Sequence, residues 1–255
     1  MENENKNSEK GFTAFVLLDK PVFDKKAFAS DLANTWGISY KESENDQYSV
    51  LFEEDDMVAA LSIVSVPVPD KEASICAETN YMWADAKKVT DAHKAHLIVA
   101  VVGKQEDMVK KAELFVKLLS TAANQEAAVG VYANGTVYEP NMFMDFASVM
   151  HKGVLPLYNL VWFGMYLNDG VFSAYTNGLS AFGYQEIEVL NAICEPVELQ
   201  RFIASLAAYV LEEKATLKEG DTIGFNIDDV HKVHQSGGVA MPGITIKVDF
   251  NPIEQ

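Results

Sequence analysis

The stretch "LIVAVVGKQEDMVKKAELFVKLLSTAANQ", residues 97–125, decides the fold class. Its first seven residues form a continuous apolar run of strand length, which is typical of a central strand. Glu106 and Asp107 follow, and their charges suit the N-terminus of a helix. Apolar residues then recur at helical spacing, which predicts a long amphipathic helix after the strand. The inner stripe of this helix consists of Met108, Ala112, Phe115, Leu119 and Ala122.

The neighbouring segments extend this pattern in both directions. Downstream, "AAVGVYANGTVYEP" (127–140) predicts two short strands joined by a turn at Asn134-Gly135. The elements expected upstream are a strand at 12–18, a helix within 23–37 that Gly37 ends, two strands within 47–56 and 57–69 joined by an acidic turn, and a short helix within 81–96.

The second half of the chain repeats part of this order. A hairpin over 157–177 turns at residues 168–170, and a strand over 185–193 precedes a helix over 195–214 with Pro196 in its first turn. Strands "DTIGF" (221–225) and "GITIKVDF" (243–250) follow, with a polar loop expected between them over 226–243.

A strand, a long helix and another strand beside hairpins therefore occur in each half. This order predicts an α+β protein with mixed or antiparallel sheets, built as two ferredoxin-like βαβ-containing halves. We expect a disordered tail over 1–10, an N-terminal half over 11–140 and a C-terminal half over 141–255, pseudo-duplicated and packed as one compact domain.

The composition excludes several classes of function. The net charge is -17, and Arg201 is the one arginine, so nucleic acid and anionic membranes would be repelled. The N-terminal "MENENKNSEK" lacks the apolar region of a signal peptide, and no apolar run reaches the length of a membrane span. Cys76 and Cys194 are far apart and favour reduced thiols over a disulfide. These features predict a cytoplasmic protein.

The stretch "TNGLSAFGYQEIEV" (176–189) raises the question of a phosphate-binding loop, because Gly178 and Gly183 have the glycine spacing of such loops. A P-loop also requires a lysine, a hydroxyl and a following helix, whereas here Tyr184 and a predicted strand follow Gly183. The two glycines are therefore predicted to provide backbone geometry for a tight connection.

Two glutamates follow this loop. Glu186 and Glu188 alternate with apolar residues, so both carboxylates point to one face of a strand. That arrangement suits acid–base chemistry or a divalent cation, and it equally suits a strand with one face in water.

The histidines form two H-x-x-H pairs, His93 with His96 and His231 with His234. A pair at this spacing on a helix can share a metal ion. The first pair, however, spans a predicted helix end and strand start, and the second lies in the expected polar loop. We therefore predict structural roles and no metal or other cofactor. Trp83 is interpreted as a packing anchor, with a ligand platform as the alternative.

Several of these blocks resemble the domain of unknown function 4261 family. The resemblance is carried by "VPVPDKEASICAETNYMWADAKKVTDAHKAHLIVAVVG" (66–103), "AAVGVYANGTVYEPNMF" (127–143) and "YTNGLSAFGYQEIEV" (175–189), followed by "EPVELQRFIASLAAYVLEE" (195–213) and "EGDTIGF" (219–225). It extends from about residue 12 to the C-terminus, with Ala133 standing where the family has tryptophan. The resemblance implies a fold and no chemistry. The candidate residues that it places in family blocks are Trp83, His93, His96, Gly178, Gly183, Glu186 and Glu188.

Three functions fit these observations. The first is a non-enzymatic, acidic interaction protein that binds another protein with a basic surface, by analogy in an immunity or regulatory role. The second is an enzyme, or a binder of a small ligand or metal, whose site joins His93, His96, Glu186 and Glu188. The third is an oligomer-forming domain with the apolar segment 157–166 at the subunit interface.

Overall fold

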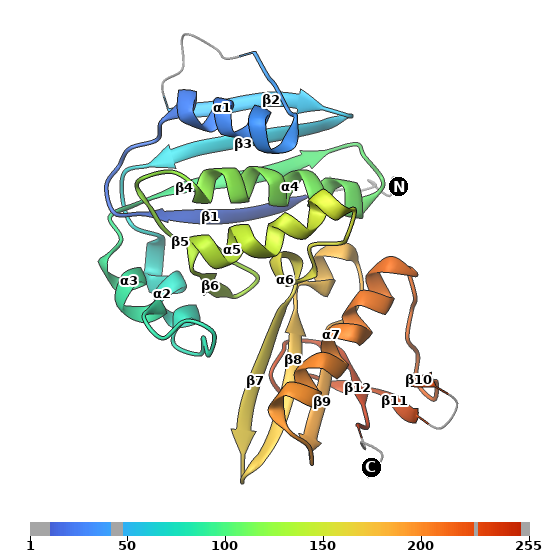
Figure 1. Cartoon of the computed structure of the whole chain (residues 1–255). Helices are drawn as coiled ribbons and strands as arrows, with labels where there is room; N and C mark the ends of the chain where they lie inside the picture. Colours follow the sequence, from blue (N-terminus) through green and yellow to red (C-terminus); the bar gives the residue numbers. More distant parts are fainter. Residues whose placement is uncertain (1–10, 42–47, 227–228, 251–255) are drawn as a thin grey trace, which may run out of the picture. The chain divides into compact units, whose positions relative to one another are not determined.

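The chain folds into two units that each contain one six-stranded sheet. The computed structural model describes residues 11–41, 48–226 and 229–250 (Figure 1). The N-terminal unit comprises residues 1–159 and the C-terminal unit residues 160–255. Helices accompany both sheets, and the sheets are antiparallel or mixed, which confirms the α+β class.

The N-terminal unit has an antiparallel sheet of order β2-β3-β4-β1-β5-β6. β1 lies between β4 and β5 and is antiparallel to both, so β4 and β5, which α4 connects, are parallel to each other, as in the split βαβ unit of ferredoxin-like folds. The main elements are β1 (Phe12–Leu18), α1 (Lys25–Trp36), β2 (Ser49–Glu54), β3 (Met57–Val64), β4 (Ala95–Gly103), α4 (Met108–Ala123), β5 (Ala128–Ala133) and β6 (Thr136–Tyr138). The shorter helices are η1 (Pro69–Lys71), α2 (Glu72–Ala77), α3 (Ala86–Ala92), α5 (Pro140–Ala147) and η2 (Ser148–Lys152).

Local signals in the sequence set the limits of the two long helices of this unit. The Asp24 side chain accepts the Ala27 N–H at the start of α1, and Gly37 takes the left-handed conformation that ends it. The Asp107 carboxylate accepts the Val109 N–H at 2.9 Å and so caps α4. The predicted central strand at 97–103 is confirmed as β4.

One face of the N-terminal sheet carries the long helices. Phe12 of β1 stacks on Phe115 of α4 with ring centroids 5.5 Å apart, and α4 lies across β4 and β1 (Figure 1). The opposite face is covered by α2 and α3 only over β1, β5 and β6, where Leu17, Tyr132 and Val137 join a small core. Within the described part of this unit, helices therefore cover both faces of the sheet at one side and one face at the other.

The C-terminal unit has a mixed sheet of order β10-β11-β12-β9-β8-β7. The predicted hairpin is confirmed over 162–177, with Asp169 and Gly170 at positive φ in its turn, whereas the first predicted residues, 157–160, form a short helix. The elements are β7 (Trp162–Asn168), β8 (Val171–Asn177), η3 (Leu179–Phe182), β9 (Ile187–Ala192), α7 (Pro196–Glu212), β10 (Thr222–Asn226), β11 (Asp229–Gly237) and β12 (Ile244–Val248). The short α6 (Leu157–Leu160) precedes them.

Two expectations for this unit were wrong. The segment 226–243 is not only loop, because β11 runs through it and pairs with β12. α7 joins β9 to β10, and two strands, β12 and β11, lie between them in the sheet, whereas a ferredoxin-like unit has one strand at that place. The split βαβ order expected for both halves is therefore found only in the N-terminal unit. Alternation of apolar residues predicts strands, but the pairing partners are set by contacts distant in sequence.

The division between the units lies after Asn159. α5 belongs to the N-terminal unit. The boundary predicted from the sequence lies after residue 140, which would place most of α5 in the C-terminal half. Leu160, Val161, Trp162 and Phe163 are buried, which leaves little of the segment 157–166 for a subunit interface. Duplication of the halves stays a prediction. Within the described ranges, no helix combines the length and apolar character needed to cross a bilayer.

Candidate functional site

Both ring nitrogens of His93 are hydrogen-bonded to the backbone. The Val68 N–H donates to Nε2 at 2.8 Å, and Nδ1 bonds the Thr90 carbonyl. Because a carbonyl only accepts, Nδ1 carries the proton and Nε2 is the acceptor. The ring is buried at the end of α3 and has no nitrogen left for a metal ion or a proton transfer. His93 fastens the segment before α2 to the start of β4.

His96 and Trp83 also have structural contacts. The His96 Nδ1 donates to the Val66 carbonyl at 2.9 Å, and the ring packs edge-on against Phe15. Burial lowers the pKa of His96, and the hydrogen bond to Val66 opposes this only in part, so the ring is neutral near pH 7. Trp83 packs on the small core under α2 and α3, in agreement with the packing interpretation.

We expect His93→Ala to destabilise the N-terminal unit by about 1–3 kcal/mol, because the buried Val68 N–H would lose its acceptor. Urea unfolding followed by hydrogen exchange of residues 12–103 measures this change. Lys94→Ala, at the exposed neighbouring position, is the control. Equal stabilities of the two variants would contradict the structural role.

The glycine-containing loop 176–183 binds an anion, and that anion is the chain's own Glu186. The Gly178 and Ser180 N–H groups donate to Oε1 at 3.0 and 2.9 Å. The Leu179 N–H and the Thr176 hydroxyl donate to Oε2 at 3.3 and 2.7 Å. Successive backbone N–H groups form such anion-binding concavities in turns. The loop therefore resembles a phosphate site in geometry, but a buried carboxylate fills it.

The Glu188 carboxylate occupies a second, similar site. The N–H groups of Val239, Ala240 and Met241 donate to it at 2.7–3.0 Å. Lys247, the cross-strand neighbour of Glu188, forms an ion pair with it at 2.7 Å. Burial by itself would raise the pKa of Glu188, but Lys247 and these N–H groups outweigh it and hold the pKa below the ordinary value.

Neither glutamate therefore lies on a solvated strand face. Glu186 and Glu188 are buried, and each joins β9 to a loop elsewhere in the C-terminal unit. His93, His96 and Trp83 belong to the N-terminal unit, so each unit uses its candidate residues internally. A shared site of the four residues stays a prediction. Among the described residues, no group of three or more His, Cys, Asp or Glu side chains has the arrangement to hold a metal ion.

His231 and His234 cannot share a metal ion, because they lie on a strand and not on a helix or in a loop. Residues three apart on β11 point to opposite faces of the sheet. The buried His231 ring packs against Phe202 and Phe250. His234 is partly exposed and lies between the carboxylates of Glu219 and Asp249, at 3.3 and 3.2 Å.

These two carboxylates stabilise the protonated form of His234. Glu219 first and Asp249 second raise the pKa of His234 above the ordinary 6.5. The protonated form is favoured in the folded state, so its contribution to stability is full below pH 6.5 and is lost as the pH rises through the higher folded pKa. An NMR titration of His234 in wild type and Glu219→Gln checks this, with a lower pKa expected in the variant. An unchanged pKa would contradict the pairing.

The uncovered part of the N-terminal sheet presents an apolar surface. Outward-facing residues of β2, β3 and β4 pair across the strands, as Leu51 does with Ala60 and Val58 with Val102. Leu51 and Val102 are 67% and 36% exposed. We call this surface the open sheet face, and its apolar members are Leu51, Val58, Ala60, Ile98, Ala100 and Val102. The run "MVAALSIV" (57–64), apolar at nearly every position, was its signal in the sequence.

Acidic residues lie at one end of the open sheet face. Glu53 is the cross-strand partner of Val58, and Asp55 and Asp56 form the turn that follows β2. Glu53, Asp55 and Asp56 are exposed. An apolar centre with a charged rim is the composition of a protein-binding surface.

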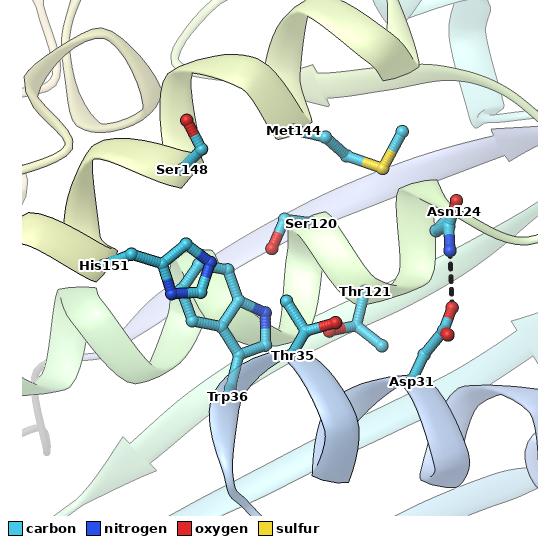
Figure 2. A pocket seen from close by; sticks show the side chains of 9 residues that line it. All are labelled: Asp31, Thr35, Trp36, Ser120, Thr121, Asn124, Met144, Ser148 and His151. Atoms are coloured by element: carbon cyan, nitrogen blue, oxygen red, sulfur yellow. Dashed lines mark hydrogen bonds between the residues drawn. The ribbon is translucent and has the colours of Figure 1, made fainter.

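A pocket of about 200 Å³ lies on the other side of the N-terminal sheet, among α1, α4, α5 and η2 (Figure 2). Trp36 and His151 stack at one end, with ring centroids 4.5 Å apart. At the other end the Asn124 side chain donates to the Asp31 carboxylate. The remaining lining residues are Thr35, Ser120, Thr121, Met144 and Ser148. No sequence motif indicated this pocket, since its walls come from segments about ninety positions apart.

Both cysteines are free thiols, as expected, and they lie in different units. The Cys76 sulfur is 3.6 Å from the Tyr132 hydroxyl, which donates to Glu72 at 2.7 Å. Burial, followed by these two neighbours, raises the pKa of Tyr132 far above its ordinary value, so the hydroxyl remains protonated.

The comparison with protein families supports the resemblance of the C-terminal blocks. Residues 175–249 match the family described as "Domain of unknown function (DUF4261)". The matched range contains the Glu186 and Glu188 sites and most of the C-terminal sheet, whereas the blocks at 66–103 and 127–143 lie outside it. Comparisons with curated proteins and with solved structures found no match. The segment 175–249 thus matches the domain of unknown function 4261 family, and in this segment Glu186 and Glu188 bind backbone N–H groups of two loops of the C-terminal unit.

Proposed function

We propose that the protein is a non-enzymatic interaction module that binds a basic protein through the open sheet face. The observation that carries this proposal is the apolar surface on three adjacent strands, with exposed side chains on β2 and β4 and partly exposed side chains on β3 between them. Contiguous apolar surface of this kind marks sites where another molecule removes it from water. Leu51 and Val102 are the most exposed apolar residues of this face, so a bound partner would remove the most apolar surface from water at these two positions.

The charge of the chain favours a basic partner over a second copy. Two copies would each bring a net charge of -17 to the contact, and like charges side by side oppose binding. Glu53, Asp55 and Asp56 at the end of the open sheet face would pair with lysines or arginines around an apolar centre on the partner. Such pairing raises the association rate and makes it sensitive to salt. An immunity or regulatory role is the biological setting that this chemistry suits.

Leu51→Lys is expected to weaken partner binding at least about tenfold, because it places a positive charge in the apolar centre opposite a basic surface. Leu167→Lys is the matched control, since Leu167 is 60% exposed near the end of edge strand β7, as Leu51 is 67% exposed on edge strand β2. Both variants are expected to change stability by no more than about 0.5 kcal/mol, as exposed positions do.

The partner is first identified by photo-crosslinking in the host, with a crosslinking amino acid at Leu51, at Val102 and, as control, at Tyr209. The expected result is one basic protein joined at the first two positions and not at the third. The purified partner is then titrated against wild type and both variants at low and high salt. Equal adducts at all positions, salt-independent binding, or equal affinities of the two variants would overturn the proposal. So would a dimer of this chain that Leu51→Lys dissociates, because a second copy would then occupy the face.

A further inference from the structure

We propose that the pocket among α1, α4 and α5 binds a primary alkylammonium group. The pocket lies on the helix-covered side of the N-terminal sheet, so this inference does not depend on binding at the open sheet face. Its lining combines a carboxylate, an aromatic stack and hydroxyl groups. The charge of each group and the hydrogen-bonding atoms that it has left determine which ligand fits.

Three of the four hydroxyl groups that line the pocket, all except that of Thr35, already donate to backbone carbonyls. Ser120 and Thr121 donate to the Lys117 carbonyl at 3.1 and 2.7 Å, and Ser148 donates to the Asp145 carbonyl at 2.7 Å. Each hydroxyl has one proton, so only its acceptor lone pairs are left for a ligand. A ligand that meets these oxygens must therefore donate.

The carboxylate of the pocket is fixed in place. The Asn124 amide of α4 donates to Asp31 Oδ2, which holds the carboxylate of α1 across the gap between the two helices (Figure 2). Oδ1 and the remaining lone pairs are available for a further donor. None of the nine described lining residues is a lysine or an arginine, so the negative charge of Asp31 has no cation within the pocket lining.

The aromatic end of the pocket favours the same kind of ligand. Trp36 is half-buried and stacks with His151 at an interplanar angle of 10°. A cation within about 6 Å of an indole ring is attracted by its electron-rich face. Met144 adds a polarisable apolar side chain beside the hydroxyl groups.

The ammonium group of an alkylamine meets these conditions, because it donates three hydrogen bonds, accepts none and carries a positive charge. The alkyl stem would contact Trp36 and Met144, as lysine stems do on apolar surfaces. The volume of about 200 Å³ is below the roughly 300–1,000 Å³ of pockets for drug-sized ligands, so one side-chain-sized group fits. The ammonium group can come from a free polyamine or from a lysine of a protein.

Butylammonium chloride is the probe that tests this inference, with 1-butanol as the neutral analogue. Binding is followed by NMR at pH 7.5 through the Trp36 indole signal and the backbone amides of residues 120–124. We expect saturable shifts with butylammonium and none with butanol. Asp31→Asn, which keeps the shape and removes the charge, is expected to weaken binding about tenfold or more. Asp145→Asn, at an exposed aspartate outside the lining, is expected to bind as wild type does.

Equal shifts with butanol, no saturable shift with butylammonium, or unchanged affinity in Asp31→Asn would overturn the inference. The two sources of the ammonium group are then compared with spermidine and with an acetylated lysine amide. Tighter binding of spermidine assigns the pocket to a free polyamine, and tighter binding of the lysine amide assigns it to a protein side chain. Leu51→Lys is expected to leave butylammonium binding unchanged, which separates this test from that of the open sheet face.

Discussion

Lys247→Met is expected to destabilise the C-terminal unit by about 3–5 kcal/mol, the cost of breaking a buried ion pair from one side. The Glu188 carboxylate is fully buried and Lys247 nearly so, with 2.7 Å between Nζ and Oε2. Removing the ammonium group leaves a buried negative charge with only neutral donors, the Thr245 hydroxyl and the N–H groups of residues 239–241. The loss of stability is expected to include the segment 237–243, since Lys247 also donates to the Gly237 carbonyl.

Hydrogen exchange of residues 160–250 in urea, read by mass spectrometry, measures this change for the C-terminal unit separately from the N-terminal unit. The double variant Glu188→Leu with Lys247→Met is the control, because removing both charges together avoids the isolated charge. It is expected to recover part of the stability even though the N–H groups then lose their acceptor. A double variant no more stable than Lys247→Met would mean that the isolated charge is not the cause.

The lowered pKa of Glu188 also predicts how the stability of the C-terminal unit changes in acid. The group binds a proton less readily in the folded state than in the unfolded chain, where its pKa is about 4.3. Its contribution to stability is therefore present above that value and is lost as the pH falls through the lower folded pKa. We expect the acid unfolding of the C-terminal unit to shift to higher pH in Lys247→Met.

Gly178→Ala is expected to have the second large effect. Gly178 has φ of 143°, which side-chain-bearing residues rarely adopt, and an added Cβ would lie 2.2 Å from the Leu160 carbonyl oxygen. Contact with a backbone atom cannot be relieved by a rotamer change, so the loop 176–183 would have to move. Movement would break the bonds from the Gly178 and Ser180 N–H groups to Glu186. A loss of about 3 kcal/mol or more is expected from strain and lost hydrogen bonds together.

Gly170→Ala separates the cost of a positive φ from the cost of the contact with the Leu160 carbonyl. Gly170 also has positive φ, of 82°, but nothing lies within 4 Å of the place where its Cβ would stand. We expect it to cost only about 1–2 kcal/mol, the penalty of the left-handed conformation. Urea unfolding of both variants, followed over residues 160–250, compares them directly. Equal losses would mean that the contact with Leu160 plays no part.

Much of the fold followed from local patterns. Gly37, Asn134-Gly135 and Asp169-Gly170 predicted a helix end and two hairpin turns where the structure has them. These signals act within a few residues of the elements they limit, so no tertiary information is needed to read them. The strand pairing in the C-terminal unit did not follow, since "DTIGF" and "GITIKVDF" gave no indication that β11 lies between them.

For the candidate site residues, too, the sequence predicted local features and missed the contacts that they make. From the sequence, the two glycines predict backbone geometry for a tight connection, and the glutamates separately predict two carboxylates on one strand face. Their relation was missed, since the sequence does not indicate that Glu186 turns back into the loop eight positions before it. The histidines were selected for metal spacing, but the Val66 and Val68 backbone groups that they bind lie 30 and 25 positions away.

The sequence by itself determined the α+β class, the main helices, both hairpins, the net negative charge and the resemblance of the C-terminal segment to a known family. Each of these depends on residue type, on spacing within one element or on summed charge. Only the tertiary structure decided that the glutamates are buried anchors, that β2, β3 and β4 leave an apolar face uncovered, and that Asp31 meets Asn124 beside Trp36 and His151. These features depend on which groups meet after the chain has folded, and distant contacts leave no periodic trace in the sequence.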